Sequence, residues 1–138
     1  MFQRILVPVD LTDRNAPAIE IAGRLVADDG GTVVLLHIIE TLDIPFEELE
    51  DFYHRLEAKA MAVLGESAAP LRDAGVAFDH HVRYGDRAEE IVAFAREDGS
   101  DLLVLTSHRI DLESPGSGWT TLSYKVAILA QCPVLLIK

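Results

Sequence analysis

The chain has 138 residues, of which 49% are hydrophobic and 25% are charged, which is the composition of one globular domain and not of a disordered chain. Its 23 acidic residues outnumber its 12 basic ones and give a net charge of −11, which argues against nucleic acid or an anionic membrane as a partner. The one cysteine permits no internal disulfide, and no apolar run suits a signal peptide or the roughly 20 residues that span a bilayer. We therefore expect a single cytoplasmic domain over residues 1–138.

Five short segments rich in aliphatic and β-branched residues predict strands. Four of them are apolar throughout, which is typical of parallel strands covered by helices on both faces. The other segment, residues 76–82, alternates between apolar and polar side chains and predicts an edge strand with one wetter face. The four apolar segments are residues 5–7, 32–39, 102–106 and 134–137.

Apolar residues at helical spacing lie between these segments and predict four helices. Thr12 or Asp13 can cap the first, and the second segment ends at Gly75. Asp86 can cap the third and Gly99 follows its end, and Pro133 follows the fourth. The alternation predicts right-handed crossovers and a three-layer, doubly wound, five-stranded parallel sheet of Rossmann-like type, folded as one α/β domain. The four apolar stripes are Ala18, Ile21, Ala22 and Leu25; Leu49, Tyr53, Leu56, Ala60 and Leu64; Ala88, Ile91, Val92 and Ala95; and Leu122, Val126 and Leu129.

Ligands of such sheets bind beyond the carboxyl ends of the strands, so those ends are the segments that predict function. The first strand is followed by Asp10-Leu11-Thr12-Asp13, which has no glycine and carries two acids that repel phosphate. The sequence also contains no GxGxxG or Walker pattern. The long connection over residues 107–118 has a length typical of a functional or mobile loop.

Five segments, in order and in one register along almost the whole chain, resemble the universal stress protein family. That resemblance implies an adenine-nucleotide α-hydrolase-like fold, a role in the stress response and, in many members, the binding of ATP or AMP. The segments are Ile5-Leu6-Val7-Pro8-Val9-Asp10, Leu35-Leu36-His37-Ile38-Ile39, Gly85 with Glu89-Glu90-Ile91, Asp101-Leu102-Leu103-Val104-Leu105, and Cys132-Pro133-Val134-Leu135-Leu136-Ile137.

The resemblance also implies a set of nucleotide-binding residues. Asp10 stands where the family bonds the ribose, and the backbone at Ile38 stands where it meets the adenine. The family's phosphate loop reads glycine, two residues, glycine, nine residues, glycine, then serine or threonine. Adding the neighbours of these positions, the expected site is Pro8, Val9, Asp10, Ile38, Thr106, Ser107, Arg109, Thr120, Thr121 and Leu122.

This chain departs from the family pattern at the phosphate loop. Thr106, Arg109 and Thr120 stand at the three glycine positions, with a spacing to Thr120 that is one residue longer than the family's, while Thr121 keeps the hydroxyl. A glycine allows close approach of backbone to phosphate, so these replacements indicate an altered site in which Arg109 can pair with phosphate. Two interpretations remain: nucleotide binding through a degenerate loop, or the same fold acting as a nucleotide-independent protein partner. Asp10 likewise either binds a ligand or caps the first helix.

The resemblance further implies a homodimer through the last strand. Val134, Leu135, Leu136 and Ile137 would otherwise form an exposed apolar edge, unless a helix or loop covers them. A further protein partner is expected but its identity is unknown.

Catalysis and metal binding have little support in the sequence. Ser107 and His108 are neighbours that face opposite ways on an extended chain, as do His80 and His81. We expect no metal site, and we expect no catalytic activity beyond slow hydrolysis of ATP.

The negative charge is unevenly distributed along the chain. All 23 acidic residues precede Ser114, and residues 114–138 carry two lysines and no acid. The acid-free segment contains the proposed end of the phosphate loop, the last helix and the last strand, which is where we expect anion binding and self-association.

Overall fold

The computed structural model describes residues 1–41, 43–107, 113 and 121–138, and its centre is a five-stranded, fully parallel sheet. The strand order is β3-β2-β1-β4-β5, with β3 and β5 at the two edges. This confirms the predicted doubly wound α/β fold and the edge position of the alternating strand. The strands are β1 (Arg4–Pro8), β2 (Thr32–Ile39), β3 (Ala77–Tyr84), β4 (Leu102–Thr106) and β5 (Val134–Ile137).

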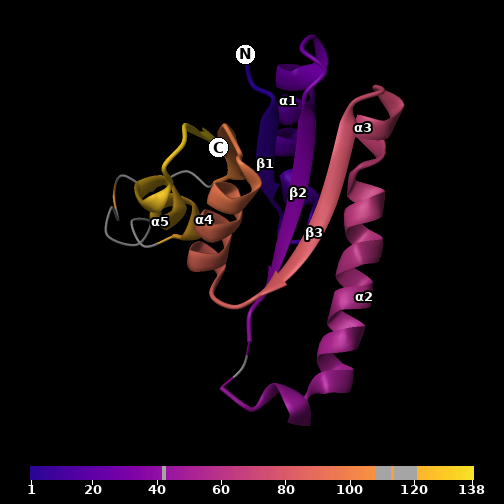
Figure 1. Ribbon diagram of the computed structural model, residues 1–138, viewed down its shortest axis with the longest axis vertical. Coiled ribbons are helices and arrows are strands. Elements are labelled where there is room, and N and C mark those ends of the chain that lie inside the picture. The colour runs from indigo at the N-terminus through magenta and orange to yellow at the C-terminus, as the bar shows by residue number, and fades with distance from the viewer. Residues whose placement is uncertain (42, 108–112, 114–120) are drawn as a thin grey trace.

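Helices cover both faces of the sheet and make three layers, as Figure 1 shows with α2 and α3 on one side and α4 and α5 on the other. The helix α1 packs with α3 on the first face. The helical elements are the 3₁₀ turn η1 (Asp13–Asn15), α1 (Ala16–Ala27), the 3₁₀ turn η2 (Phe46–Glu48), α2 (Glu50–Ser67), α3 (Ala69–Asp73), α4 (Arg87–Asp98) and α5 (Leu122–Leu129). None of the helices in the described part of the chain is both long and apolar enough to cross a membrane.

Two apolar layers hold the sheet between the helices. Successive residues of β1 point to opposite faces, so Ile5 and Val7 pack towards α1 and Leu6 packs towards α4, all with no exposed surface. Burial on both faces explains why the inner strands are apolar throughout.

The buried face of α1 differs from the prediction. Ala18 and Ala22 are buried as expected, but Ile19 and Val26 complete the stripe, and Leu25 is largely exposed. The reason lies in α3, which packs so closely that a Cβ added at Gly23 would lie 2.8 Å from Leu71 Cδ2. The face that carries the glycine therefore turns inward.

The second helical segment is also divided where the sequence pattern predicts one helix. The helix α2 ends at Ser67, and α3 begins at Ala69 with Pro70 in its first turn. Proline lacks the N–H that a continuous helix needs at that position, so the chain starts a new helix instead.

The strand order reverses at the centre of the sheet. The chain passes from β1 outward through β2 to β3, returns to β4 on the other side of β1, and ends at β5. The connections that leave β1 and β4 diverge at this point and open a crevice at the carboxyl ends of the strands.

Candidate functional site

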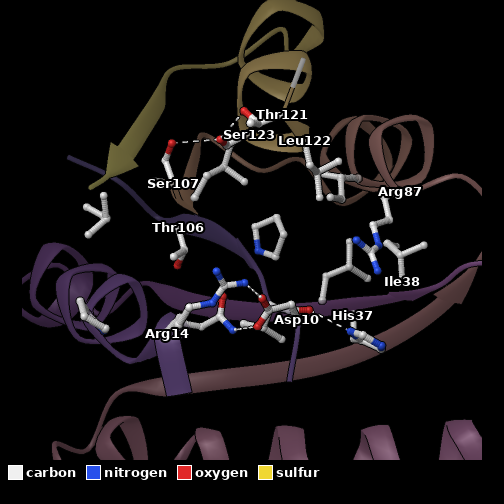
Figure 2. A pocket seen from close by; sticks show the side chains of 18 of the residues that line it. Asp10, Arg14, His37, Ile38, Arg87, Thr106, Ser107, Thr121, Leu122 and Ser123 are labelled. Atoms are coloured by element: carbon white, nitrogen blue, oxygen red, sulfur yellow. Dashed lines mark hydrogen bonds and ion pairs between the residues drawn. The ribbon is translucent and has the colours of Figure 1, made fainter. Parts of the chain in front are cut away.

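A cavity of about 480 Å³ opens at this switch point. All the predicted site residues that the structure describes line it, as Figure 2 shows for most of them. Arg109 and Thr120 lie outside the described residues. The predicted residues along the cavity are Pro8, Val9, Asp10, Ile38, Thr106, Ser107, Thr121 and Leu122.

Asp10, just beyond β1, organises the loop that forms one wall of the cavity. Its Oδ1 accepts hydrogen bonds from the Thr12 N–H at 3.0 Å, the Thr12 hydroxyl at 2.5 Å and Asn15 Nδ2 at 2.5 Å. Its Oδ2 accepts one from Arg14 Nη2 at 2.7 Å. Partial burial opposes ionisation of this carboxyl, but the hydrogen bonds from Thr12, Arg14 and Asn15 outweigh it and hold the pKa of Asp10 well below its ordinary value.

The sequence left open whether Asp10 binds a ligand or caps the first helix, and in the structure Asp10 is not itself the cap of that helix. Thr12, whose hydroxyl accepts from the Arg14 N–H at 3.4 Å, is the N-cap of η1 rather than of α1. Asp10 accepts a hydrogen bond from the Thr12 N–H and so supports that cap from two residues before it.

Asn15 is the buried support of this loop and was not predicted as a site residue. It is 4% exposed, lines the cavity, and donates to both Asp10 Oδ1 and the Thr12 carbonyl oxygen, the latter at 3.1 Å. A buried amide with two acceptors fixes the orientation of the carboxylate.

Hydroxyl groups line the opposite wall, where β4 ends and α5 begins. Ser123 donates to Ser107 at 3.0 Å, and its Oγ lies 3.4 Å from the Thr121 hydroxyl. The buried Thr106 hydroxyl has no hydrogen-bond partner among the described residues. A buried hydroxyl without a partner is uncommon, and beside a cavity it provides a contact for a ligand.

The N-terminus of α5 also lies at this wall, where Thr121, Leu122 and Ser123 line the cavity. Thr121 is its N-cap but makes no side-chain hydrogen bond to the helix. The first N–H groups of a helix need acceptors, and together with the helix dipole they favour an anion.

Among the described residues, three cationic side chains and one carboxylate, that of Asp10, line the cavity. Arg14 pairs with Asp10, Arg87 Nε donates to Glu40 Oε1 at 2.9 Å, and Lys138 contacts the Tyr124 hydroxyl. This local balance is opposite in sign to the net charge of −11 for the whole chain. None of these three cations was predicted from the sequence as a site residue.

His37 lines the cavity but is already engaged. Its Nδ1 lies 2.9 Å from the Val9 carbonyl oxygen, which can only accept, so this nitrogen carries the proton. In the described part of the chain, no three His, Cys, Asp or Glu side chains cluster as metal ligands would.

The sheet order and the cavity define a doubly wound α/β protein with a small-molecule crevice at its switch point, and comparison with known proteins assigns it to a family. The universal stress protein family matches residues 1–138. The chain is 25% identical over 150 residues to the universal stress protein YxiE of Bacillus subtilis (strain 168), with all of both chains covered. The chain belongs to the universal stress protein family.

Solved structures agree in fold. A universal stress protein in complex with cAMP has a TM-score of 0.76 and 19% identity, covering 99% of this chain and 97% of that one. A universal stress protein from Archaeoglobus fulgidus in complex with dAMP has a TM-score of 0.73 and 20% identity, covering 99% of this chain and 98% of that one. At such identities the likeness establishes the fold.

Proposed function

We propose that this protein binds an adenine nucleotide, such as AMP or ATP, in the cavity at the switch point and acts as a regulatory protein of the stress response. The observation that carries the proposal is a cavity with three cations against one carboxylate in a chain of net charge −11. The complexes of similar proteins with cAMP and dAMP support the choice of an adenine nucleotide.

The two walls of the cavity suit the two ends of such a ligand. Val9 and Ile38 offer apolar surface and backbone groups for a base, and Asp10 offers a carboxylate oxygen for a ribose hydroxyl. The phosphate would lie at the opposite wall of the cavity, against the hydroxyls of Thr106 and Thr121 and the N-terminus of α5, whose N-cap side chain makes no hydrogen bond to the helix.

Calorimetric titration with ATP, ADP, AMP and cyclic AMP tests this proposal. We expect at least one of them to bind with a Kd below about 1 mM, or roughly −4 kcal/mol. If none binds at that level, the nucleotide-independent interpretation replaces this one.

A pair of hydroxyl variants tests the placement of the ligand. Thr106→Val keeps the shape of the side chain but removes a buried, unpartnered hydroxyl from the cavity wall, and should weaken the best nucleotide by about 3- to 10-fold. Ser100→Ala is the matched control, because the Ser100 hydroxyl is also buried and unpartnered but does not line the cavity. Equal affinity in both variants would place the ligand away from Thr106.

We also propose that two copies pair along β5. This strand pairs only with β4 within the described sheet, and Leu135 on it is exposed, as are Ile128 and Leu129 at the end of the preceding helix α5. A second copy would cover both the open strand edge and these apolar side chains.

A further inference from the structure

The carboxylate of Asp10 has one oxygen that a ligand can reach, and a side chain of the protein occupies it. Oδ1 is saturated by the two groups of Thr12 and by the buried Asn15. Oδ2 has a single partner among the described residues, Arg14 Nη2 at 2.7 Å. A ligand hydroxyl that binds Asp10 therefore meets Arg14 at Oδ2, where it shares the oxygen with the guanidinium or competes with it.

The pair between Asp10 and Arg14 is easily exchanged. The Arg14 side chain is 74% exposed and that of Asp10 is 39% exposed, so water screens their attraction. Arg14 makes one hydrogen bond to the carboxylate through Nη2. A guanidinium carries five N–H donors, and it can bind a phosphate through two of them at once, which is a stronger arrangement.

Arg14 is also placed to meet a phosphate. It lies on η1, lines the same cavity as Thr106 and Thr121, and reaches across the loop towards the ligand space beside Asp10 (Figure 2). Arg87 and Lys138 line the cavity as well, and they contact Glu40 and Tyr124.

We propose that Arg14 is a phosphate-binding residue, which pairs with Asp10 Oδ2 and also binds the phosphate of a nucleotide in the cavity. This inference rests on the proposed nucleotide site and adds to it a preference for phosphorylated ligands. A nucleotide offers the guanidinium a phosphate as a further partner, whereas a nucleoside offers it none. The site therefore prefers phosphorylated ligands, and a side chain supplies the phosphate contact where the family pattern has glycines.

The test is the affinity of AMP relative to adenosine in wild type and in Arg14→Gln. We expect the variant to bind AMP more weakly and adenosine equally well or better, so that the ratio of the two affinities falls by about tenfold or more. Arg14→Lys keeps the positive charge and should retain part of the ratio. Arg24→Gln is the matched control, because it removes an exposed arginine of α1 that does not line the cavity.

The possible failures are distinguishable. If wild type binds AMP and the ratio is unchanged in Arg14→Gln, the role of Arg14 is refuted while the nucleotide site stands. If wild type binds neither AMP nor any other adenine nucleotide, the nucleotide site itself is refuted and the role of Arg14 with it. Melting temperatures of the variants check that each is folded.

Discussion

At the scale of single residues, Asp10 links the charge of the cavity to the stability of the loop around it. Its carboxylate accepts hydrogen bonds from three residues, all of which favour the ionised form. Because these bonds lower the pKa below the ordinary 3.8, the folded state holds this proton less tightly than the unfolded state does. The stabilisation is therefore complete above about pH 5 and is lost progressively as the pH falls from there towards the lowered pKa of the folded state.

Asp10→Asn tests this dependence. At pH 7 we expect the variant to have a lower free energy of unfolding by about 1 kcal/mol or less, because Asp10 and Arg14 are both open to screening by water. The difference from wild type should shrink as the pH is lowered to 3, where the wild-type carboxyl begins to lose its advantage. Urea denaturation at the two pH values measures it, and a difference that grew towards pH 3 would contradict the assignment.

The cavity residues at the strand ends were predictable from the sequence, whereas those that reach the cavity from a neighbouring turn were not. Asp10 and Thr106 follow from the rule that ligands bind where parallel strands end. Arg14 and Asn15 enter the cavity because η1 turns the chain back over Asp10, and that turn depends on hydrogen bonds that have no periodic pattern. Arg87 lines the cavity only because α4 starts beside the end of β2, which requires the strand order.

At the scale of elements, α4 shows local signals that agree with the fold. Asp86 caps its start by accepting from the Glu89 N–H at 3.0 Å, and Gly99 ends it with a φ of 72°, a conformation that suits glycine. Both ends were predicted, since caps depend on residues within one turn of the chain. The break between α2 and α3 and the rotation of α1 were not, because they depend on Pro70 in a helical pattern and on contact with another helix.

Removal of the α4 cap should destabilise the protein. Asp86→Ala leaves the Glu89 N–H without its side-chain acceptor and should lower the free energy of unfolding by about 1 kcal/mol. Asp73→Ala serves as the control, because it removes an exposed aspartate at the far end of α3, where no cap is lost. Equal stability of the two variants in urea would show that the cap contributes little.

At the scale of the whole molecule, the two edges of the sheet differ in how they meet solvent. The edge strand β3 is eight residues long and carries Asp79, His81 and Arg83, charged or polar groups that discourage pairing with another chain. The other edge strand, β5, is four residues long and apolar. It follows α5 in the chain, and Ile128 near the end of that helix is exposed. Self-association is therefore expected at β5 and not at β3.

A charge placed on β5 tests the proposed dimer. Leu135→Lys should convert the dimer to monomer, because a buried lysine in the interface would lack a partner. Leu25→Lys is a close control, since Leu25 on α1 is 38% exposed and Leu135 is 37% exposed. Light scattering after size exclusion gives the mass, and a dimer that persists in Leu135→Lys would place the interface elsewhere.

The order of the strands has a consequence for how the protein opens. The cavity is built on the ends of the inner strands β1, β2 and β4 and on Ile137 at the end of the edge strand β5, whereas the described residues of the other edge strand, β3, do not line it. Backbone amides of inner strands exchange with solvent mainly through global unfolding, while those of edges exchange through local opening. A ligand at 100 times its Kd would thus add about 2.7 kcal/mol to the protection of the slowest amides and leave those at the β3 edge almost unchanged. Occupancy of the cavity would act on the lifetime of the whole folded chain, so that ligand concentration and resistance to proteolysis rise together.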